Sequence, residues 1–357
     1  MIRKLASILI SFLSVFFILS QHLGKNSNGL DLFKIDLDLP PEKRFVEVGK
    51  YFKSGIQLSF KDYFPFPLPY LVKFIGKIFW KLKPENYLEA IGLSEAVEID
   101  PNIILASQYI YDLSAFCTSV ITKDKNGTII HARNLDFYYA SQMRNITYEG
   151  HFYKNNKIIF SAVMFAPLNT VMTGFKNNAF SISLNEREPS YRKSPLSLLS
   201  NVARIIKGYV SAGTLIRNTL ETCDDFACAF EKLRDTKQIS AAYYAVAGVN
   251  ENEGAVISKG AEGPDHIDKL GENQWYIVQT NDDHWKGICN IRCSYFKDSL
   301  DYIGREDLKA QDLLDILKKW PSNNILSIYS TLFIPSKATF VSYLLDGDKP
   351  SPDEVGF

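Results

Sequence analysis

A cysteine at the start of a β-hairpin constrains the fold of this chain more than any other pattern in the sequence. Residues 118–122 alternate as a strand does, the run Lys-Asp-Lys-Asn-Gly at 123–127 predicts a turn, and 128–132 supply the return strand. Cys117 stands directly before the first of these strands. We interpret it as a nucleophile, since a thiol at the end of a rigid hairpin is well placed to attack a substrate.

The turn also predicts which residues meet across the hairpin. If Asn126 and Gly127 are the two loop residues, Cys117 lies opposite Asp136 on the same face, about 5 Å away between Cβ atoms. Arg133 has the other parity, so it would join this pair only through a bulge or at the strand end, and bulges are common beside active sites. Without further support, Cys117 reads as a buried small hydrophobe, and Arg133 and Asp136 read as a structural ion pair.

Six motifs in a fixed order make the chain resemble the family of acid ceramidase and N-acylethanolamine acid amidase. These are lipid amidases with the N-terminal-nucleophile (Ntn) fold, related to the bile-salt hydrolases. The motifs are Asp-Leu-Asp-Leu-Pro-Pro at 36–41, Phe-Cys-Thr-Ser at 116–119, Arg-Asn-Leu-Asp at 133–136, Thr-Gly-Phe at 173–175, Leu-Asn-Glu-Arg at 184–187 and Gln-Thr-Asn-Asp-Asp-His-Trp at 279–285.

Runs of strands and runs of helices alternate in blocks after the cysteine, which indicates stacked layers rather than a parallel βαβ sheet. The resemblance implies an α+β fold, the four-layer αββα sandwich of Ntn hydrolases. It also implies that the precursor cuts itself between Phe116 and Cys117, leaving an α/β heterodimer. The expected parts are a signal peptide at 1–20, a helical α subunit at 21–116 with a loose polar leader to about residue 32, and a catalytic β subunit at 117–357.

An N-terminal cysteine supplies the nucleophile of amide hydrolysis and, through its α-amino group, the base. The ordinary pKa of that amine is about 8, so neighbours must tune it, and Asp136 is the carboxylate placed to hold it. Arg133 would position the substrate carbonyl or stabilise charge near the sulfur. By the resemblance, Asn281 matches an oxyanion donor, Asn185 an active-site polar residue and Arg292 a further active-site arginine. Without the resemblance, both asparagines read as turn formers at strand ends.

Two other functions fit parts of the sequence. A thiol protease would pair Cys117 with His131, but a papain-like cysteine opens a helix and this one opens a strand. A lipid-binding protein without catalysis would rely on an amphipathic segment at 71–82. The full set of expected active-site residues argues against such a loss of catalysis.

Residues 71–82 have the pattern of a basic amphipathic helix. One stripe is basic and the opposite face is apolar, through Lys73, Lys77 and Lys81 on one side and Phe74, Ile78 and Trp80 on the other. This pattern suits a membrane interface, although it is also the usual pattern of a helix packed on a soluble body. Since the resembling family acts on lipids in membranes or micelles, we expect peripheral contact with such a surface.

Residues 1–20 have the order of a secretory signal peptide: two basic residues, an apolar run of about fifteen, and a small residue before a polar one. Asn126 and Asn145 begin glycosylation sequons, which matter only in the secretory pathway. We therefore expect a lysosomal or secreted protein. Lys plus Arg and Asp plus Glu both number 40, so no net charge attracts the chain to nucleic acid.

Five cysteines are an odd count, so one thiol stays unpaired if the others form disulfides. Once the proposed nucleophile is set aside, the simplest arrangement is two local disulfides, Cys223 with Cys228 and Cys289 with Cys293. A metal at the second pair is the alternative, but a Cys-x-x-Cys spacing and a nearby second ligand pair are both missing. We expect no metal and no cofactor.

Together these patterns predict a hydrolase of linear amide C–N bonds that converts N-acylethanolamines and related fatty-acid amides to a fatty acid and an amine. Ceramide hydrolysis to sphingosine and fatty acid is the alternative. Residues 74–77, 243–244 and 283–285 look like the N-acylethanolamine branch of the family, whereas 36–41 and 184–187 look like the ceramidase branch.

Overall fold

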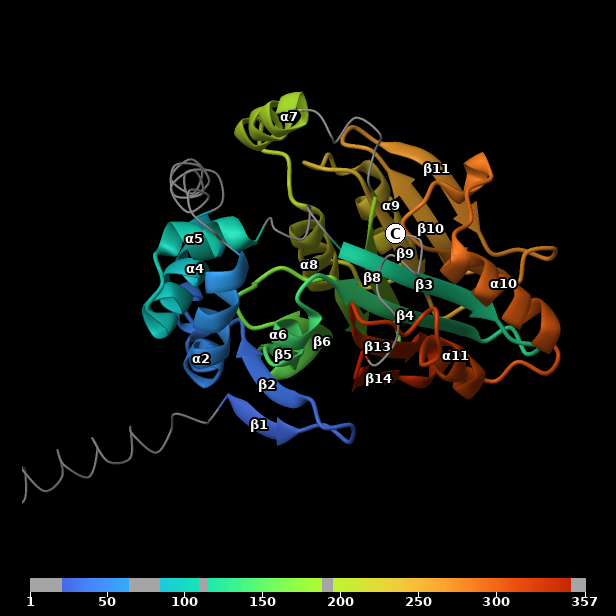
Figure 1. Cartoon of the computed structure of the whole chain (residues 1–357), viewed down its shortest axis with the longest axis horizontal. Helices are drawn as coiled ribbons and strands as arrows, with labels where there is room; N and C mark the ends of the chain where they lie inside the picture. Colours follow the sequence, from blue (N-terminus) through green and yellow to red (C-terminus); the bar gives the residue numbers. More distant parts are fainter. Residues whose placement is uncertain (1–20, 64–83, 109–114, 188–194, 348–357) are drawn as a thin grey trace, which may run out of the picture.

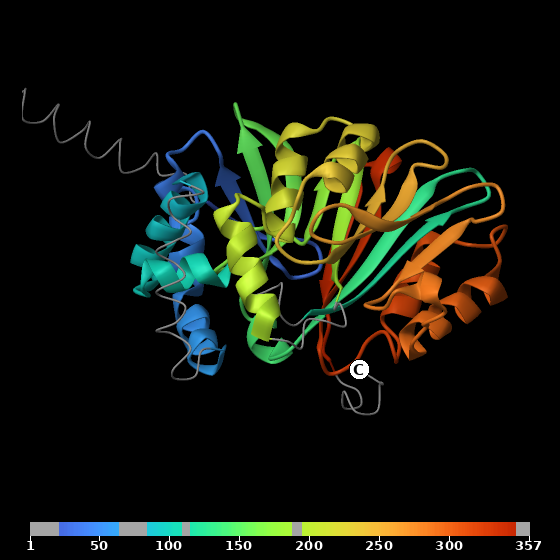
Figure 2. The ribbon, with the colours of Figure 1, turned by 90° about the horizontal axis from the view of Figure 1, so that it is seen from above.

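The computed structural model describes residues 21–63, 84–108, 115–187 and 195–347. Two β-sheets pack face to face, and helices cover the outer face of each (Figures 1 and 2). This is the four-layer αββα arrangement that we predicted, so the α+β fold class is confirmed.

The larger sheet has nine strands in the order β1-β2-β5-β6-β7-β8-β9-β10-β11. All neighbouring pairs are antiparallel except β2 and β5. The strands are β1 (His22–Lys25), β2 (Asp31–Asp36), β5 (Thr147–Lys154), β6 (Lys157–Phe165), β7 (Thr173–Lys176), β8 (Phe180–Glu186), β9 (Ala242–Ala247), β10 (Gly254–Lys259) and β11 (Pro264–Lys269).

The smaller sheet has five antiparallel strands in the order β12-β3-β4-β13-β14. It contains the hairpin of β3 and β4, which carries Cys117. The strands are β3 (Ala115–Lys123), β4 (Ile129–Phe137), β12 (Tyr276–Gln279), β13 (Ser327–Ile334) and β14 (Thr339–Leu344).

Alternation along β3 separates the two faces of the smaller sheet. Val120 points to a core shared with Phe296 and Leu313, which lie on α10 (Ile291–Ile303) and α11 (Ala310–Leu317). Ile121, the next residue, points the other way and packs with Tyr243 of the larger sheet. Cys117 has the parity of Ile121, so its thiol lies between the sheets.

Most of the remaining helices cover the larger sheet or its N-terminal edge, whereas α6 packs against β4 and β13 of the smaller sheet. Leu220 of α8 packs closely on Gly174 of β7, where any side chain beyond hydrogen would collide with the leucine. The helices are α2 (Val46–Tyr63), α4 (Pro84–Val97), α5 (Pro101–Ser107), α6 (Ala140–Arg144), α7 (Pro195–Ile206), α8 (Ala212–Thr222) and α9 (Phe226–Asp235), with short 3-10 turns η1 (Pro41–Lys43), η3 (His284–Lys286) and η4 (Pro335–Lys337).

Two expectations about local structure are wrong. The segment expected to be a loose leader forms β1 and β2, which extend the larger sheet by parallel pairing with β5 and bury Phe33 and Ile35. The hairpin register is also shifted by one residue, because Cys117 pairs with Leu135 rather than with Asp136.

The shift in register comes from the loop. The Asp124 carboxylate accepts hydrogen bonds from the backbone N–H groups of Asn126 and Thr128, which closes a longer turn. Gly127 lies at φ +79°, the left-handed conformation that follows the turn in a three-residue hairpin loop. An odd loop in place of the expected two-residue loop puts Arg133, not Asp136, on the face of Cys117.

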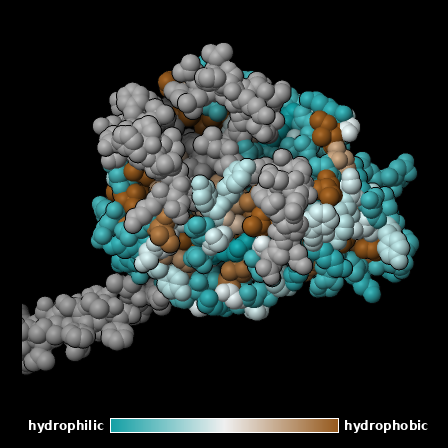
Figure 3. Space-filling model, in the orientation of Figure 1, coloured by the Kyte–Doolittle hydropathy of each residue, from teal (hydrophilic) through white to brown (hydrophobic). Residues whose placement is uncertain are grey.

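In the part of the chain that the structure describes, no helix is both long and apolar enough to cross a bilayer. The surface over the α10 end of the molecule is mostly hydrophilic (Figure 3). The expected signal peptide and the amphipathic segment at 71–82, with Lys73, Lys77, Lys81, Phe74, Ile78 and Trp80, lie outside the described residues.

Candidate active site

The Cys117 sulfur lies against an arginine. Arg133 Nη2 donates a hydrogen bond to Cys117 Sγ at 3.0 Å, and both side chains are fully buried. Nη1 of the same guanidinium is fixed by the Met172 carbonyl at 2.9 Å and the Thr173 hydroxyl at 2.5 Å. No bulge is needed to bring the pair together, since they share a face in the observed register. A fixed cation beside sulfur favours the thiolate, the nucleophilic form of cysteine.

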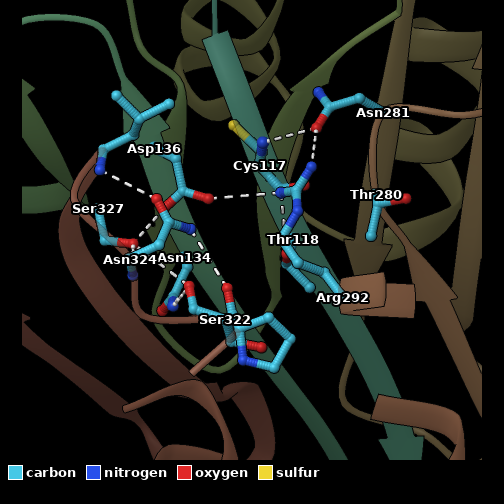
Figure 4. A network of polar contacts seen from close by, with 12 residues as sticks. Cys117, Thr118, Asn134, Asp136, Thr280, Asn281, Arg292, Ser322, Asn324 and Ser327 are labelled. Carbon is cyan, nitrogen blue, oxygen red and sulfur yellow. Dashed lines mark hydrogen bonds and ion pairs between the residues drawn. The ribbon is translucent and has the colours of Figure 1, made fainter. Parts of the chain in front are cut away.

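The main chain of Cys117 is held by two other predicted residues. Its N–H donates to Asn281 Oδ1 at 2.9 Å, and its carbonyl accepts from Arg292 Nη1 at 2.9 Å. Arg292 Nη2 donates to the same Asn281 oxygen at 2.9 Å, so the three residues form a closed ring of hydrogen bonds (Figure 4). Asn281 Nδ2 donates to the Glu186 carbonyl, and its expected role as oxyanion donor stays a prediction.

Asp136 joins this network from the neighbouring strand position. Its Oδ2 lies 3.4 Å from Arg292 Nη1, and its Oδ1 accepts a hydrogen bond from Ser327 Oγ at 2.6 Å. Burial raises the pKa of Asp136 to about 6, although Arg292 and Ser327 act in the opposite direction. The carboxyl therefore changes its charge in the mildly acidic range, beside the backbone of Cys117.

Asn185 reaches the active-site strand β3 through Ser119. It accepts a hydrogen bond from Ser119 Oγ at 2.6 Å and donates to the carbonyls of Gln279 and Thr280. Ser119 follows Cys117 on the same face of β3. Asn185 thus ties the two sheets together beside the site and fixes the strand end that leads to Asn281.

His131 is not a partner of the cysteine. Its ring nitrogens lie 2.9 and 2.8 Å from the hydroxyls of Ser181 and Ser183, and Arg133 lies between it and Cys117 along the strand. Burial, helped by Arg133, lowers the pKa of His131 to about 3, so the ring is neutral. The Cys–His pair of a thiol protease is absent.

Both local disulfides are present, Cys223 to Cys228 and Cys289 to Cys293. The second closes the first turn of α10, the turn that carries Arg292. Asn290 caps the same helix and donates a hydrogen bond to Asp282 at 2.8 Å. The disulfide and the cap hold Arg292 and the loop after Asn281 in one rigid unit, and the bonded sulfurs are not free to bind a metal.

Sequence reasoning missed the contribution of β13. Ser327 binds Asp136, and a bulge between Ser327 and Tyr329 interrupts the pairing of β13 with β4 at this point. The Tyr329 hydroxyl lies 2.7 Å from Thr173 Oγ1, which itself binds Arg133. The β-branched and aromatic run of β13 between two prolines was a usable signal for this strand.

An apolar cavity lies next to the site. Phe137 follows Asp136 on β4, and the Met172 carbonyl binds Arg133, so two lining residues adjoin the network directly. The lining consists of Ser59, Phe60, Ser107, Phe137, Met143, Ile146, Phe165, Pro167, Leu168 and Met172. The lining is apolar, but the volume is about 40 Å³, so the cavity has room for a small apolar group and not for a whole acyl chain.

The other predicted sites lie away from this centre. Asn126 and Asn145, the sequon asparagines, are both exposed, so a glycan would meet no packing obstacle at either side chain. Phe116 and Cys117 both lie in strand β3, so the expected cut would fall inside this strand. What the structure describes is therefore the geometry of the uncut chain.

The comparisons with known proteins agree with this geometry. A family described as linear amide C–N hydrolases, choloylglycine hydrolase family, matches residues 117–299, so the match begins at Cys117.

An N-acylethanolamine-hydrolyzing acid amidase of Caenorhabditis elegans is 30% identical over 327 residues, 87% of this chain and 91% of that protein. An acid ceramidase of Homo sapiens is 30% identical over 352 residues, 89% of this chain and 87% of that protein. The solved structure of a Caenorhabditis elegans N-acylethanolamine-hydrolyzing acid amidase ortholog superposes with a TM-score of 0.59 at 30% identity, covering 64% of this chain and 100% of that one.

Proposed function

Since this chain belongs to the choloylglycine hydrolase family of linear amide C–N hydrolases, we propose that Cys117 is the nucleophile with which it cleaves fatty-acid amides. The contact between Arg133 Nη2 and Cys117 Sγ carries this proposal, because it places a fixed cation on the one cysteine outside the disulfides. The apolar lining beside the site supports a hydrocarbon group next to the scissile amide, and its volume of about 40 Å³ would take only a small part of an acyl chain.

The same sulfur cuts the precursor. The Cys117 thiolate attacks the carbonyl carbon of Phe116, the C–N bond breaks as the Cys117 nitrogen takes up a proton, and a thioester forms. Water hydrolyses the thioester, which releases the Phe116 carboxylate and regenerates the thiol. Cys117 then has a free amine, which acts as the general base toward a substrate amide. Asn281 Oδ1, already 2.9 Å from that nitrogen, would hold the amine in place.

N-acylethanolamines are the substrates that we favour, and ceramide is the alternative. The Caenorhabditis elegans N-acylethanolamine-hydrolyzing acid amidase and the Homo sapiens acid ceramidase are each 30% identical to this chain. Short segments around Tyr243 and Trp285 resemble the N-acylethanolamine branch. In the structure these two rings lie edge to face at 6.4 Å, and the Tyr243 hydroxyl donates to the backbone carbonyl of Asn281 at 3.3 Å.

The setting of the reaction is also part of the proposal. The pattern of residues 1–20 supports secretion or delivery to the lysosome, and the exposed sequons at Asn126 and Asn145 support glycosylation on that route. The amphipathic segment at 71–82 would bring the cleaved heterodimer to the lipid surface that carries its substrate.

The test compares turnover of an N-acylethanolamine and a ceramide of equal acyl length by the matured protein. The proposal predicts release of fatty acid from both at acidic pH, with the higher kcat/KM for the N-acylethanolamine. A higher kcat/KM for ceramide would reverse the choice of substrate while leaving the amidase intact. Cys117→Ala should lose turnover of both substrates. A Cys117→Ala protein that still releases fatty acid would overturn the role of the cysteine.

A further inference from the structure

Three metal-binding side chains meet at the edge of the larger sheet, away from the sulfur. His266 and Asp268 lie two residues apart on β11, so both point to the same face of this edge strand. His284 begins the turn η3, three residues after Asn281. Among the residues that the structure describes, these form the one group of three whose ligand atoms all lie within 4.8 Å of one another.

Each histidine of this group contacts a different oxygen of the Asp268 carboxylate. His266 Nε2 lies 3.2 Å from Asp268 Oδ1, and His284 Nε2 lies 2.9 Å from Asp268 Oδ2. Zinc bonds to imidazole and carboxylate are about 2.0–2.2 Å, which puts neighbouring donor atoms of a tetrahedron roughly 3.3 Å apart. An ion could therefore enter once the two histidines turn slightly toward each other.

The surroundings keep both rings in position. Trp285 stacks on the His266 ring at 4.7 Å and meets the His284 ring edge-on at 5.4 Å. Arg187 covers Trp285 at 5.2 Å, and its two ion pairs to Asp283 anchor it to the same loop. His284 Nδ1 is buried with no hydrogen-bond partner among the described residues, so the contacts with Trp285 and Asp268 are the ones that position this ring.

A cleft gives access to the group. It has a volume of about 400 Å³, and Asp268 and His284 form part of its wall together with Lys297 and Asp301. Three protein ligands beside an open cleft leave a fourth position for water or an exogenous ligand, as in zinc sites that are not purely structural.

We propose that His266, Asp268 and His284 bind one divalent transition-metal ion of the zinc type. Two imidazoles and a carboxylate are the ligands that zinc accepts most readily after thiolate, whereas calcium and magnesium prefer oxygen donors alone. The ion would cross-link the edge strand β11 to the loop that follows Asn281. Because Asn281 holds the Cys117 nitrogen, occupancy would also stiffen the active-site loop.

Zinc chloride titrated by calorimetry into the full-length, chelator-treated protein at neutral pH tests the proposal. We expect one Zn²⁺ per chain, and a loss of affinity of at least about tenfold in both His266→Gln and His284→Gln. The matched control is His151→Gln, which removes a histidine that contacts one carboxylate, Glu149, at 2.8 Å. This control should bind like the wild type. Cobalt added in place of zinc should give the visible absorption of a tetrahedral site in the wild type and not in the two variants.

Two results would overturn the metal site. One is a wild-type protein that binds no Zn²⁺, in which case the group is an ion-pair cluster. The other is binding that persists unchanged in both His266→Gln and His284→Gln. Both histidines are partly exposed, with 34% and 16% of the side chain accessible, so the variants should fold, and equal thermal unfolding without metal checks this.

Discussion

Asn281 accepts a hydrogen bond of 2.9 Å from the backbone nitrogen of Cys117, the atom that becomes the terminal amine if the chain is cut. In the uncut chain the side-chain oxygen of Asn281, Oδ1, holds this nitrogen, while the side-chain NH₂ group donates to the backbone carbonyl of Glu186. The two halves of one amide therefore have different tasks, and substitutions can separate them.

Asn281→Asp keeps an acceptor for the Cys117 nitrogen and for Arg292 but removes the NH₂ donor. We expect it to cut itself within about tenfold of the wild-type rate and then to turn over substrate about 100-fold more slowly, the usual cost of losing an oxyanion donor. Asn281→Ala should lose both processes. Timed gel analysis of cleavage and the kcat of the matured protein measure the two effects, and equal loss of cleavage in both variants would contradict the division of tasks.

Asp136 should make the stability of the fold depend on pH. Burial raises its pKa from 3.8 to about 6, so the folded chain favours the neutral acid more than the unfolded chain does. This contribution to stability is complete below the unfolded pKa and is lost as pH rises through about 6. Over that window the wild type should lose up to about 3 kcal/mol relative to Asp136→Asn, which stays neutral.

Urea unfolding of both proteins between pH 3.5 and 7, in a Cys117→Ala background that keeps the chain in one piece, measures the difference. Other titrating groups cancel because the two proteins share them. Parallel curves of unfolding free energy against pH would show that Asp136 has an ordinary pKa in the fold.

Glu89 should hold the two pieces of the cut chain together. Its carboxylate, fully buried on α4, receives two hydrogen bonds from Arg217 of α8 at 2.6 and 2.7 Å and one from Arg44 at 3.0 Å. Glu89→Gln removes the fully buried counter-charge of both arginines, which keep only the more exposed carboxylates of Glu85 and Glu221. We therefore expect the association of the two pieces to lose about 3–5 kcal/mol. A sizing column run at increasing urea gives the midpoint at which the two pieces separate, and the shift of this midpoint measures the loss.

Glu85→Gln is the matched control for this change. Glu85 pairs with the same Arg44, but 63% of its side chain is exposed, so its removal should cost less than about 1 kcal/mol. Equal effects of the two substitutions would mean that the buried contact with Arg217 adds nothing to the association.

The lysine stripe at 71–82 should matter only when the substrate lies in a membrane. Replacing Lys73, Lys77 and Lys81 with Glu removes roughly 1 kcal/mol of attraction per lysine to an anionic surface and adds repulsion. Binding and turnover on anionic vesicles should fall strongly, while hydrolysis of a short soluble amide stays almost unchanged. Equal loss on both substrates would mean that the segment is structural.

The control for the lysine stripe replaces three exposed lysines outside residues 71–82 with Glu. Lys125, Lys154 and Lys157 are exposed on two hairpins, and their replacement with Glu changes the net charge equally. This control should keep most of its turnover on vesicles. If turnover on vesicles falls as far in the control as in the stripe variant, net charge rather than the segment at 71–82 governs binding to the membrane.

Local patterns predicted much of this molecule but not its registers. The hairpin beside Cys117 was visible because strand alternation and an Asn-Gly turn are short-range signals. Its register was not, because the side chain of Asp124 sets the length of the loop through hydrogen bonds that no strand pattern encodes. One residue of shift decided whether Arg133 or Asp136 shares the face of the sulfur.

Contacts far apart in the sequence were the other limit. β1 and β2 are short and follow a polar stretch of chain, and they join the larger sheet because β2 pairs with β5 more than a hundred residues later. The resemblance identified Asn281 and Arg292 as active-site residues. It could not show that Arg292 and the Cys117 nitrogen both donate to Asn281 Oδ1, which depends on how α10 docks on β12.

The position of the cut tests the central claim most directly. Intact-mass spectrometry of the full-length protein, after incubation at acidic pH and reduction, should show two pieces, one ending at Phe116 and one beginning at Cys117. The Cys117→Ala protein should show a single uncut chain and no turnover. A wild-type protein that stays in one piece and is fully active, or a cut at any other bond, would contradict the account.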